Sequence, residues 1–228
     1  TSNGRRIPFA LSENGETVYL HSPSDSLFLD YTESESFGPS ATGVSKGRYA
    51  KPSTGSFNFV AMDQPTPNAA NSLPLVGPIV ISEIMYHPKE EQEAEYIELH
   101  NISNAPVTFW DEKDSTPWQF TNGIKLIFPS NPPMTMQPNE RILVVRNLSA
   151  FKQAYSAPNN TITLEWTDGA LSNQGETIEL SRPGDVNDSG IRQFIREERI
   201  VFDDGTYWPN EADGLGSALI RIDEFAYG

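Results

Sequence analysis

The chain has 228 residues, a net charge of −15 at pH 7 and no cysteine. The lack of thiols excludes disulfides, thiolate metal sites and cysteine nucleophiles, and the acidic surface would repel phosphate backbones, so we expect no nucleic-acid partner. No apolar run approaches the roughly 18 residues that span a bilayer, which argues against membrane insertion.

The first 72 residues read as short strands that are followed by a linker. Residues 64–74 (QPTPNAANSLP) are rich in Pro and Asn and carry no charge, as in a segment that joins two domains or closes one. We therefore place one domain at 1–72, a linker at 73–78 and a second domain at 79–228. Runs rich in β-branched and aromatic residues predict strands in the first domain over 17–20, 27–31, 47–49 and 57–61.

The second domain shows strand-like alternation. Ile97 and Leu99 fall on one face of a predicted strand over 96–100, while Tyr96, Glu98 and His100 fall on the other. The acidic run 90–95 before it is expected to be a solvated hairpin loop. A single helix is predicted over 149–155. The other predicted strands are 79–86, 106–110, 118–120, 124–128, 141–146, 162–166, 177–180, 192–202 and 218–222.

Turn signals separate these strands. Asn14-Gly15, Asn122-Gly123 and Asp204-Gly205 are dipeptides typical of hairpin turns. Eight or more short strands with turns at this spacing predict an all-β fold, an antiparallel β-sandwich.

The chain also repeats itself. Residues 11–23 and 171–183 share the pattern L-S-x-x-G-E-T-x-x-L-x-x-P at an offset of 160 residues, and Gly43, Ser45 and Arg48 are echoed more loosely by Gly214, Ser217 and Arg221. Such self-similarity is typical of modular arrays. A chain of 228 residues cannot hold two whole units of this period. We therefore expect the back half of one module, then a nearly complete module, in a piece of a longer protein.

Several blocks, in order, resemble the lamin tail domain family. Residues 81–88 (ISEIMYHP) and 95–101 (EYIELHN) resemble its opening, residues 171–180 match its next block, and Gly216-Ser217-x-Leu219-x-Arg221 resembles its end. The resemblance covers about 79–222 as a full domain and about 7–72 as the second half of a preceding copy. The closing strand of the second copy is then either outside the chain or supplied by residues 57–71.

The resemblance implies an immunoglobulin-like β-sandwich with no catalytic residues. Bacterial domains of this family occur in large secreted or cell-surface proteins, where they serve as accessory or interaction modules. It therefore implies a non-enzymatic, extracellular or surface-exposed module that presents loops to a protein or polysaccharide partner. The alternative is a calcium-dependent or carbohydrate-binding accessory domain attached to a secreted enzyme.

One segment carries a possible metal signal. Asp185, Asn187, Asp188 and Ser189 precede Gly190 with the oxygen spacing of the first half of an EF-hand-type calcium loop. The twelfth position would be Arg196 instead of a bidentate Glu, and no flanking helices are predicted. A polar hairpin tip between two strands explains the same residues. Calcium is the one cofactor that the sequence suggests.

Other chemistry-bearing residues have structural interpretations. Glu83 and Glu98 lie in neighbouring predicted strands and could face each other as a hydrolytic carboxylate pair, but polar strand faces explain them equally. His21, His87 and His100 lack the spacing of metal ligands.

Four tryptophans are available for stacking on a sugar or a protein. Trp208 beside Tyr207 in a predicted loop is the best candidate, and Trp110 and Trp118 are further candidates. Their alternative role is in the core.

Residues 1–72 cannot form a whole sandwich by themselves. We expect them to pack on the second domain, or to exchange strands with another molecule in a homodimer.

Overall fold

The computed structural model describes residues 10–21, 32–52, 55–156, 158, 160–205 and 207–228. It confirms the all-β fold class, with strands as the dominant element. The strand predicted over 27–31 lies outside the described residues. The chain divides into two compact units, one formed by the residues up to Leu75 together with 184–195, the other by 76–183 and 196–228. The change from Leu75 to Val76 falls within the predicted linker.

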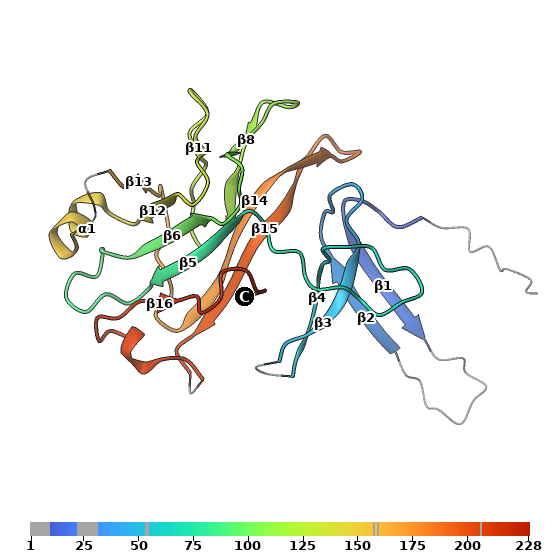
Figure 1. The fold of residues 1–228 in the computed structure, drawn as a ribbon, viewed down its shortest axis with the longest axis horizontal. Coiled ribbons are helices and arrows are strands. Elements are labelled where there is room, and N and C mark those ends of the chain that lie inside the picture. The colour runs from blue at the N-terminus through green and yellow to red at the C-terminus, as the bar shows by residue number, and fades with distance from the viewer. Residues whose placement is uncertain (1–9, 22–31, 53–54, 157, 159, 206) are drawn as a thin grey trace, which may run out of the picture. The chain divides into compact units, whose positions relative to one another are not determined.

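The second unit is a β-sandwich (Figure 1). One sheet has five strands in the order β13 (Ile162–Glu165), β12 (Arg141–Val145), β6 (Tyr96–Asn101), β5 (Ile79–Met85) and β16 (Leu219–Ile220). The other has three strands in the order β10 (Gln119–Asn122), β14 (Gly175–Val186) and β15 (Arg192–Asp203). Side chains from both sheets form one core, in which Ile97, Leu99, Ile142, Ile178 and Leu180 are completely buried.

A bulge in β5 changes which side chains face this core. Ile79 and Ile81 point inward before it, and Ile84 and Tyr86 point inward after it. The register with β6 shifts between Ile81 and Glu83. The extra residue of a β-bulge reverses the alternation that follows it. Two consecutive polar residues, Ser82 and Glu83, therefore lie on the outer face of the five-stranded sheet.

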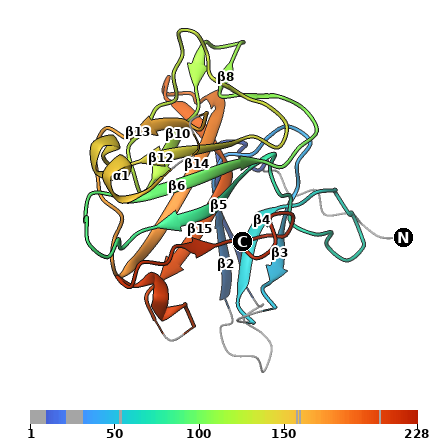
Figure 2. The same ribbon diagram turned by 60° about the vertical axis from the view of Figure 1, so that its left-hand side comes forward.

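The only α-helix found in the described residues, α1 (Leu148–Ala154), connects β12 to β13 (Figure 2). A short 3₁₀ helix, η1 (Asn210–Ala212), lies between β15 and β16. Asn147 caps it, because its side-chain oxygen accepts from the backbone N–H groups of Ser149 at 2.9 Å and Ala150 at 3.0 Å. The pairing of β12 with β13 is parallel, in a sheet whose other neighbouring strands are antiparallel. Parallel neighbours need a crossover connection, and the segment that contains α1 provides it.

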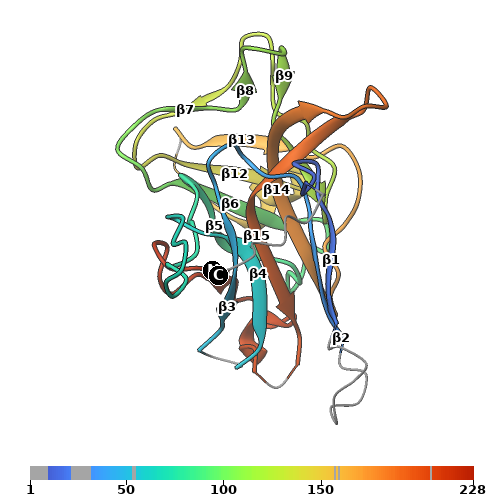
Figure 3. The same cartoon turned by 90° about the vertical axis from the view of Figure 1, so that its right-hand side faces the viewer.

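Two short antiparallel strand pairs, of which only the second is a hairpin, lie at one end of the sandwich (Figure 3). In them β7 (Val107–Thr108) pairs with β11 (Thr135–Met136), and β8 (Trp110–Asp111) pairs with β9 (Thr116–Pro117). The strand predicted over 106–110 is therefore divided between two elements. The strand predicted over 124–128 is replaced by isolated bridges from Lys125 to Asp168 and from Ile127 to Gln119.

The first unit contains two antiparallel hairpins. In one, β1 (Glu16–His21) pairs with β2 (Thr32–Phe37); in the other, β3 (Lys46–Ala50) pairs with β4 (Phe57–Ala61). Strand β2 was not predicted from the sequence, because TESESF lacks the apolar alternation on which strand prediction depends. Phe37 and Phe59 bring the two hairpins together, with ring centroids 6.3 Å apart.

The repeated motif forms the same turn in both units. The Ser12 N–H donates to Glu16 Oε1 at 2.5 Å in the first copy, and the Ser172 N–H donates to Glu176 Oε1 at 2.6 Å in the second. Each motif thus uses its own glutamate to close a turn before the strand begins, so the sequence repeat is also a structural repeat.

Steric crowding and backbone conformation require a glycine at the same position of the motif in each copy. Gly15 and Gly175 have positive φ angles of 94° and 91°. A Cβ at either position would lie 2.4 Å from a backbone oxygen, that of Phe37 in the first copy and that of Phe202 in the second. Only glycine tolerates both conditions. The same contact shows that Phe37 and Phe202 are equivalent positions of the repeat.

This equivalence also aligns an ion pair. Glu33 lies four residues before Phe37, as Glu198 lies four residues before Phe202. Arg48 contacts Glu33 in the first unit, and Arg221 Nη1 lies 2.7 Å from Glu198 Oε2 in the second. The second pair is buried, with both side chains 8% exposed, whereas those of Arg48 and Glu33 are 45% and 28% exposed.

Candidate functional site

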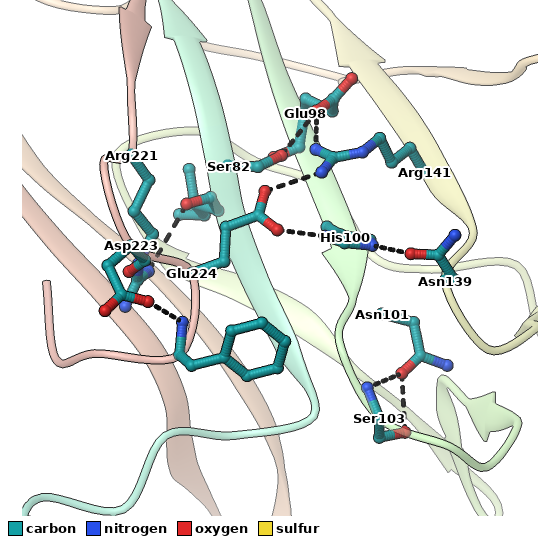
Figure 4. A network of polar contacts seen from close by, with 12 residues as sticks. Ser82, Glu98, His100, Asn101, Ser103, Asn139, Arg141, Arg221, Asp223 and Glu224 are labelled. Carbon is teal, nitrogen blue, oxygen red and sulfur yellow. Dashed lines mark hydrogen bonds and ion pairs between the residues drawn. The ribbon is translucent and has the colours of Figure 1, made fainter.

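A network of polar side chains lies on the outer face of the five-stranded sheet (Figure 4). Its members come from β5, β6, β12, the loop before β12 and the C-terminal segment 221–228, which are far apart in the sequence. They are Ser82, Glu98, His100, Asn139, Arg141 and Glu224. The network links two carboxylates, an arginine and a histidine by direct contacts, and it is therefore the candidate site.

Glu98 is held by two donors. Ser82 Oγ donates to Glu98 Oε1 at 2.7 Å, and Arg141 Nη1 donates to the same oxygen at 2.5 Å. The bulge in β5 brings Ser82 to this face. The Glu98 side chain is 19% exposed and that of Arg141 is 42% exposed. Glu98 therefore forms an ion pair with Arg141 of the neighbouring strand β12.

Glu224 connects the C-terminal segment to the sheet. Its Oε1 accepts from Arg141 Nη2 at 2.8 Å and its Oε2 lies 2.7 Å from His100 Nδ1. The other nitrogen of His100, Nε2, is 3.1 Å from Asn139 Oδ1. Burial by itself raises the pKa of Glu224, but the hydrogen bonds from Arg141 and His100 outweigh it, so the pKa lies below its ordinary value.

Arg221 folds the rest of that segment. Besides its bond to Glu198, its Nη2 donates to the carbonyl of Ala226 at 2.7 Å and its Nε donates to that of Asp223 at 3.3 Å. The backbone N–H of Arg221 donates to the Ser82 carbonyl at 2.9 Å, which continues the pairing of β16 with β5. One arginine therefore connects β15, β5 and the C-terminal turn.

The two carboxylates of the predicted pair, Glu83 and Glu98, bind different partners. Glu83 and Glu98 are opposite each other in the register of β5 and β6, as expected. Glu83, however, accepts from the Tyr96 hydroxyl at 2.5 Å, while Glu98 binds Ser82 and Arg141. Burial, and then the hydrogen bond to Glu83, raises the pKa of Tyr96 far above its ordinary value, so the hydroxyl keeps its proton.

The acidic run 90–95 is not solvated throughout, because its last two residues, Ala94 and Glu95, are buried. Glu95 is buried, with its side chain 4% exposed. Its Oε1 accepts from Arg146 Nη1 and its Oε2 from the backbone N–H of Leu171, both at 2.7 Å. Burial raises the pKa of Glu95 despite these two donors. Glu95 thereby ties the start of β6 to the repeated motif.

Asn101 ends the same strand and is completely buried. Its amide nitrogen donates to the carbonyls of Ala105, Met136 and Gln137 at 3.0–3.2 Å. Its Oδ1 accepts from the N–H and the hydroxyl of Ser103 at 3.0 and 2.8 Å. Every polar atom of this side chain is satisfied, so its role is to hold two loops.

The candidate calcium loop is the tip of the β14–β15 hairpin. Asn187 Oδ1 accepts from the backbone N–H groups of Ser189 and Ile191, both at 3.0 Å. Asp185 and Asp188 are exposed at the same tip. Among the residues that the structure describes, no group of three or more His, Cys, Asp or Glu side chains could hold a metal ion. Calcium binding here stays a prediction, and the turn accounts for Asn187 without a metal.

The tryptophans separate into core and surface residues. Trp118 is 7% exposed and meets Phe109 edge-on at 5.2 Å, so it belongs to the core and offers no open face for stacking. Trp110 is half-buried in β8. Trp208 is also half-buried and packs against the core, while its neighbour Tyr207 is 98% exposed. Tyr207 is thus the aromatic residue that the loop presents to solvent.

Each histidine has its own hydrogen-bond partners. His21 Nδ1 lies 2.9 Å from the Thr32 hydroxyl, and His87 Nδ1 lies 2.7 Å from Asp213 Oδ1. No partner of His100 was predicted from the sequence. The sequence around Arg141 and around Glu224 contains no motif that predicts their contacts in the network.

The network is built for attachment. Each of its carboxylates faces two polar partners, and Arg141 serves both of them. These contacts fix the C-terminal segment on the sheet. In the described part of the chain, no helix is both long and apolar enough to cross a membrane.

Comparison with known proteins adds no relative. No protein-family model matches the chain, and no curated protein is similar to it.

Proposed function

We propose that this chain is a non-catalytic structural and interaction module of the lamin tail type, belonging to a larger secreted or cell-surface bacterial protein. The observation that carries the proposal is the repeated framework, in which the same Ser–Glu turn and the same Glu–Arg pair occur in both units. Residues that recur at equivalent places here close turns and join strands. Modular arrays repeat framework residues of this kind.

The residues behind the family resemblance also support a framework role. Glu95 and Asn101 come from the block EYIELHN, and both are buried with their polar atoms bonded. Gly175 and Glu176 come from the second block and form the turn described above. Function would then depend on loops held by this rigid frame.

The best candidate loop lies between β15 and β16. Eighteen residues (203–220) separate Phe202 from Arg221, whereas ten (38–47) separate the equivalent Phe37 from Arg48. The longer connection contains Trp208, which packs against the core, and Tyr207, which is 98% exposed. An aromatic ring on an anchored loop suits stacking on a protein or a sugar ring.

The exposure of Tyr207 favours carbohydrate binding as a second candidate function. The test is a depletion assay with insoluble peptidoglycan, cellulose and chitin, comparing the parent chain with Tyr207→Ala. Tyr19→Ala, which removes a tyrosine that is 63% exposed in the first unit, is the matched control. Binding that is lost in Tyr207→Ala but kept in Tyr19→Ala would establish the loop as a sugar site. If the parent chain is not depleted by any of the three polysaccharides, a protein is the partner to be sought.

The non-catalytic part of the proposal has its own test. Glycoside and phosphoester substrates should show no turnover with the parent chain. Turnover that disappears in Glu98→Gln, with tryptophan fluorescence unchanged, would refute the proposal.

A further inference from the structure

We infer that Asn187, at the tip of the β14–β15 hairpin, is an acceptor site for N-linked glycosylation, in which a lipid-linked oligosaccharide is transferred to its side-chain amide. The site lies in a motif for which neither the framework role nor the Tyr207 loop accounts. The inference rests on the proposed function in one respect only, the placement of the chain outside the cytoplasm, where such donors are used.

The sequence around Asn187 matches the acceptor motif N-x-S/T and extends it. Residues 185–189 are Asp-Val-Asn-Asp-Ser, so a serine follows the asparagine by two positions and no proline intervenes. Asp185 adds an acidic residue two positions before the asparagine, which single-subunit bacterial oligosaccharyltransferases require in addition. A carboxylate at this place can form a charge-assisted hydrogen bond with a basic side chain of the enzyme.

Three other N-x-S/T triplets occur in the chain and serve as internal comparisons. In each of them the residue two positions before the asparagine is apolar, so only Asn187 has the extended motif. The asparagines of these triplets are Asn101, Asn147 and Asn159. Asn159 lies outside the described residues, so the structural comparison concerns the first two.

The side-chain amide of Asn187 has an engaged oxygen and an available nitrogen. Its Oδ1 accepts from the backbone N–H groups of Ser189 and Ile191, both at 3.0 Å. The N–H of Gly190 closes the same turn by donating to the Asn187 carbonyl at 2.9 Å. Among the described residues, none accepts a hydrogen bond from Asn187 Nδ2. The turn therefore fixes the side chain through its oxygen and leaves the nitrogen for reaction.

The other two asparagines have no such nitrogen available. Asn101 is completely buried, and its Nδ2 already donates to three carbonyls. Asn147 caps α1 through its Oδ1, and its Nδ2 donates to Glu93 Oε2 at 2.9 Å. A transferase would have to break these bonds before reaction, so the fold favours modification at Asn187.

The surroundings of Asn187 are accessible to an enzyme and suited to an attached sugar. Residues 188–190 are exposed. Val186 and Ile191, which flank the turn, are 47% and 59% exposed. The C–H groups of a sugar joined to Asn187 would cover part of these apolar side chains, which favours the glycosylated form in water. A linked glycan is bulky and hydrophilic, and an exposed turn has room for it.

The transfer is a substitution at the first sugar of the donor. Asn187 Nδ2 attacks the anomeric carbon, and the new N–C bond forms as the bond between that carbon and the pyrophosphate oxygen breaks. Polyprenyl pyrophosphate leaves with the electron pair of the broken bond, and Nδ2 gives one proton to a base of the enzyme. The donor is thus a polyprenyl-pyrophosphate-linked sugar, and the step needs no oxidant or reductant.

The experiment treats the unmodified, folded chain with a single-subunit bacterial oligosaccharyltransferase and polyprenyl-pyrophosphate-linked di-N-acetylchitobiose. Intact-protein mass spectrometry measures the transfer, and peptide mapping locates the sugar. Ser189→Ala is the decisive variant, because it removes the hydroxyl of the motif but keeps the backbone N–H that bonds to Asn187 Oδ1. Ser149→Ala is the matched control, because it changes the triplet of Asn147 in the same way and also keeps a backbone N–H on the asparagine oxygen.

The parent chain and Ser149→Ala should each gain one disaccharide, located at Asn187, and Ser189→Ala should gain none. Asp185→Asn should react at least about tenfold more slowly, which is the effect of one lost charge-assisted contact. The inference is overturned if the parent chain gains no sugar, if the sugar maps to another asparagine, or if Ser189→Ala reacts as the parent chain does. Unchanged transfer to Asp185→Asn would overturn the assignment to this class of transferase.

A synthetic peptide of residues 182–194 separates the motif from its presentation by the fold. Transfer to the peptide and to the folded chain at similar rates supports the inference. Transfer to the peptide alone would overturn it, because Asn187 would then be inaccessible in the folded chain. None of these results depends on export, on polysaccharide binding by the Tyr207 loop or on substrate turnover, so failure here is distinguishable from failure of the proposed function.

Discussion

The buried pair between Arg221 and Glu198 should contribute most of the stability at the β16 edge. Replacing Arg221 by Met keeps much of the aliphatic volume but leaves Glu198 as a carboxylate that is 8% exposed and has lost its counterion. It also removes the hydrogen bonds to the carbonyls of Asp223 and Ala226. Breaking a buried pair from one side costs about 3–5 kcal/mol, which is the loss we expect in the free energy of unfolding.

Urea unfolding followed by tryptophan fluorescence measures the loss of stability in the second unit. All four tryptophans, at 110, 118, 166 and 208, belong to the second unit, so their signal reports on that unit. The control is Lys125→Ala, which breaks the exposed contact of Lys125 with Asp168 in the same unit and should leave the midpoint unchanged. The double variant Arg221→Met with Glu198→Leu should recover most of the lost stability, because no unpaired charge then remains buried.

The effect should also depend on pH. Burial raises the pKa of Glu198 even beside Arg221. A folded state with a raised carboxyl pKa takes up its proton at higher pH than the unfolded chain does, so acid favours the folded state at this site. The deficit of Arg221→Met should therefore shrink as the pH is lowered from 7 through that pKa. A loss below about 1 kcal/mol, or a double variant as unstable as Arg221→Met, would refute the reasoning.

Four further predictions follow from the same structure. Gly175→Ala should lower the free energy of unfolding by at least about 2 kcal/mol. Gly169→Ala should lower it by about 1 kcal/mol, because Gly169 also has a positive φ of 97° but an added Cβ would lie 3.5 Å from the nearest atom. Equal losses in urea unfolding would contradict the steric argument. Asn101→Ala should lower the free energy of unfolding by about 3 kcal/mol, because it leaves buried carbonyls without a donor. An unchanged free energy of unfolding would mean that water replaces the amide. The stability gap between the parent chain and Glu224→Gln should be present at pH 7 and close as the pH falls below 4.5, because the pKa of Glu224 is lowered in the folded state; a gap unchanged at pH 3 would count against the network. Excess calcium should not shift the melting temperature relative to chelator, since backbone N–H groups already bind Asn187 Oδ1; a rise that Asp185→Ala abolishes would establish the calcium site.

The sequence determined those features that depend on close neighbours. Alternation placed Ile97 and Leu99 in the core, and the L-S-x-x-G-E frame marked a turn that both copies form. The helix predicted over 149–155 differs from α1 by one residue at each end. These signals are local, because strand alternation, turn closure and helix spacing involve residues only a few positions apart.

Tertiary structure decided what each charged residue does. Glu83 and Glu98 looked alike in the sequence, but they have different partners in the folded chain. Tyr96 binds Glu83, whereas Ser82, which the bulge turns outward, and Arg141 bind Glu98. His100 and Glu224 are 124 residues apart, and Glu95 and Leu171 are 76 apart. The core position of Trp118 and the parallel pairing of β12 with β13 likewise depend on which segments pack together. Burial and ion pairing are set by groups that meet only in the folded chain, so no local pattern of residues could encode them.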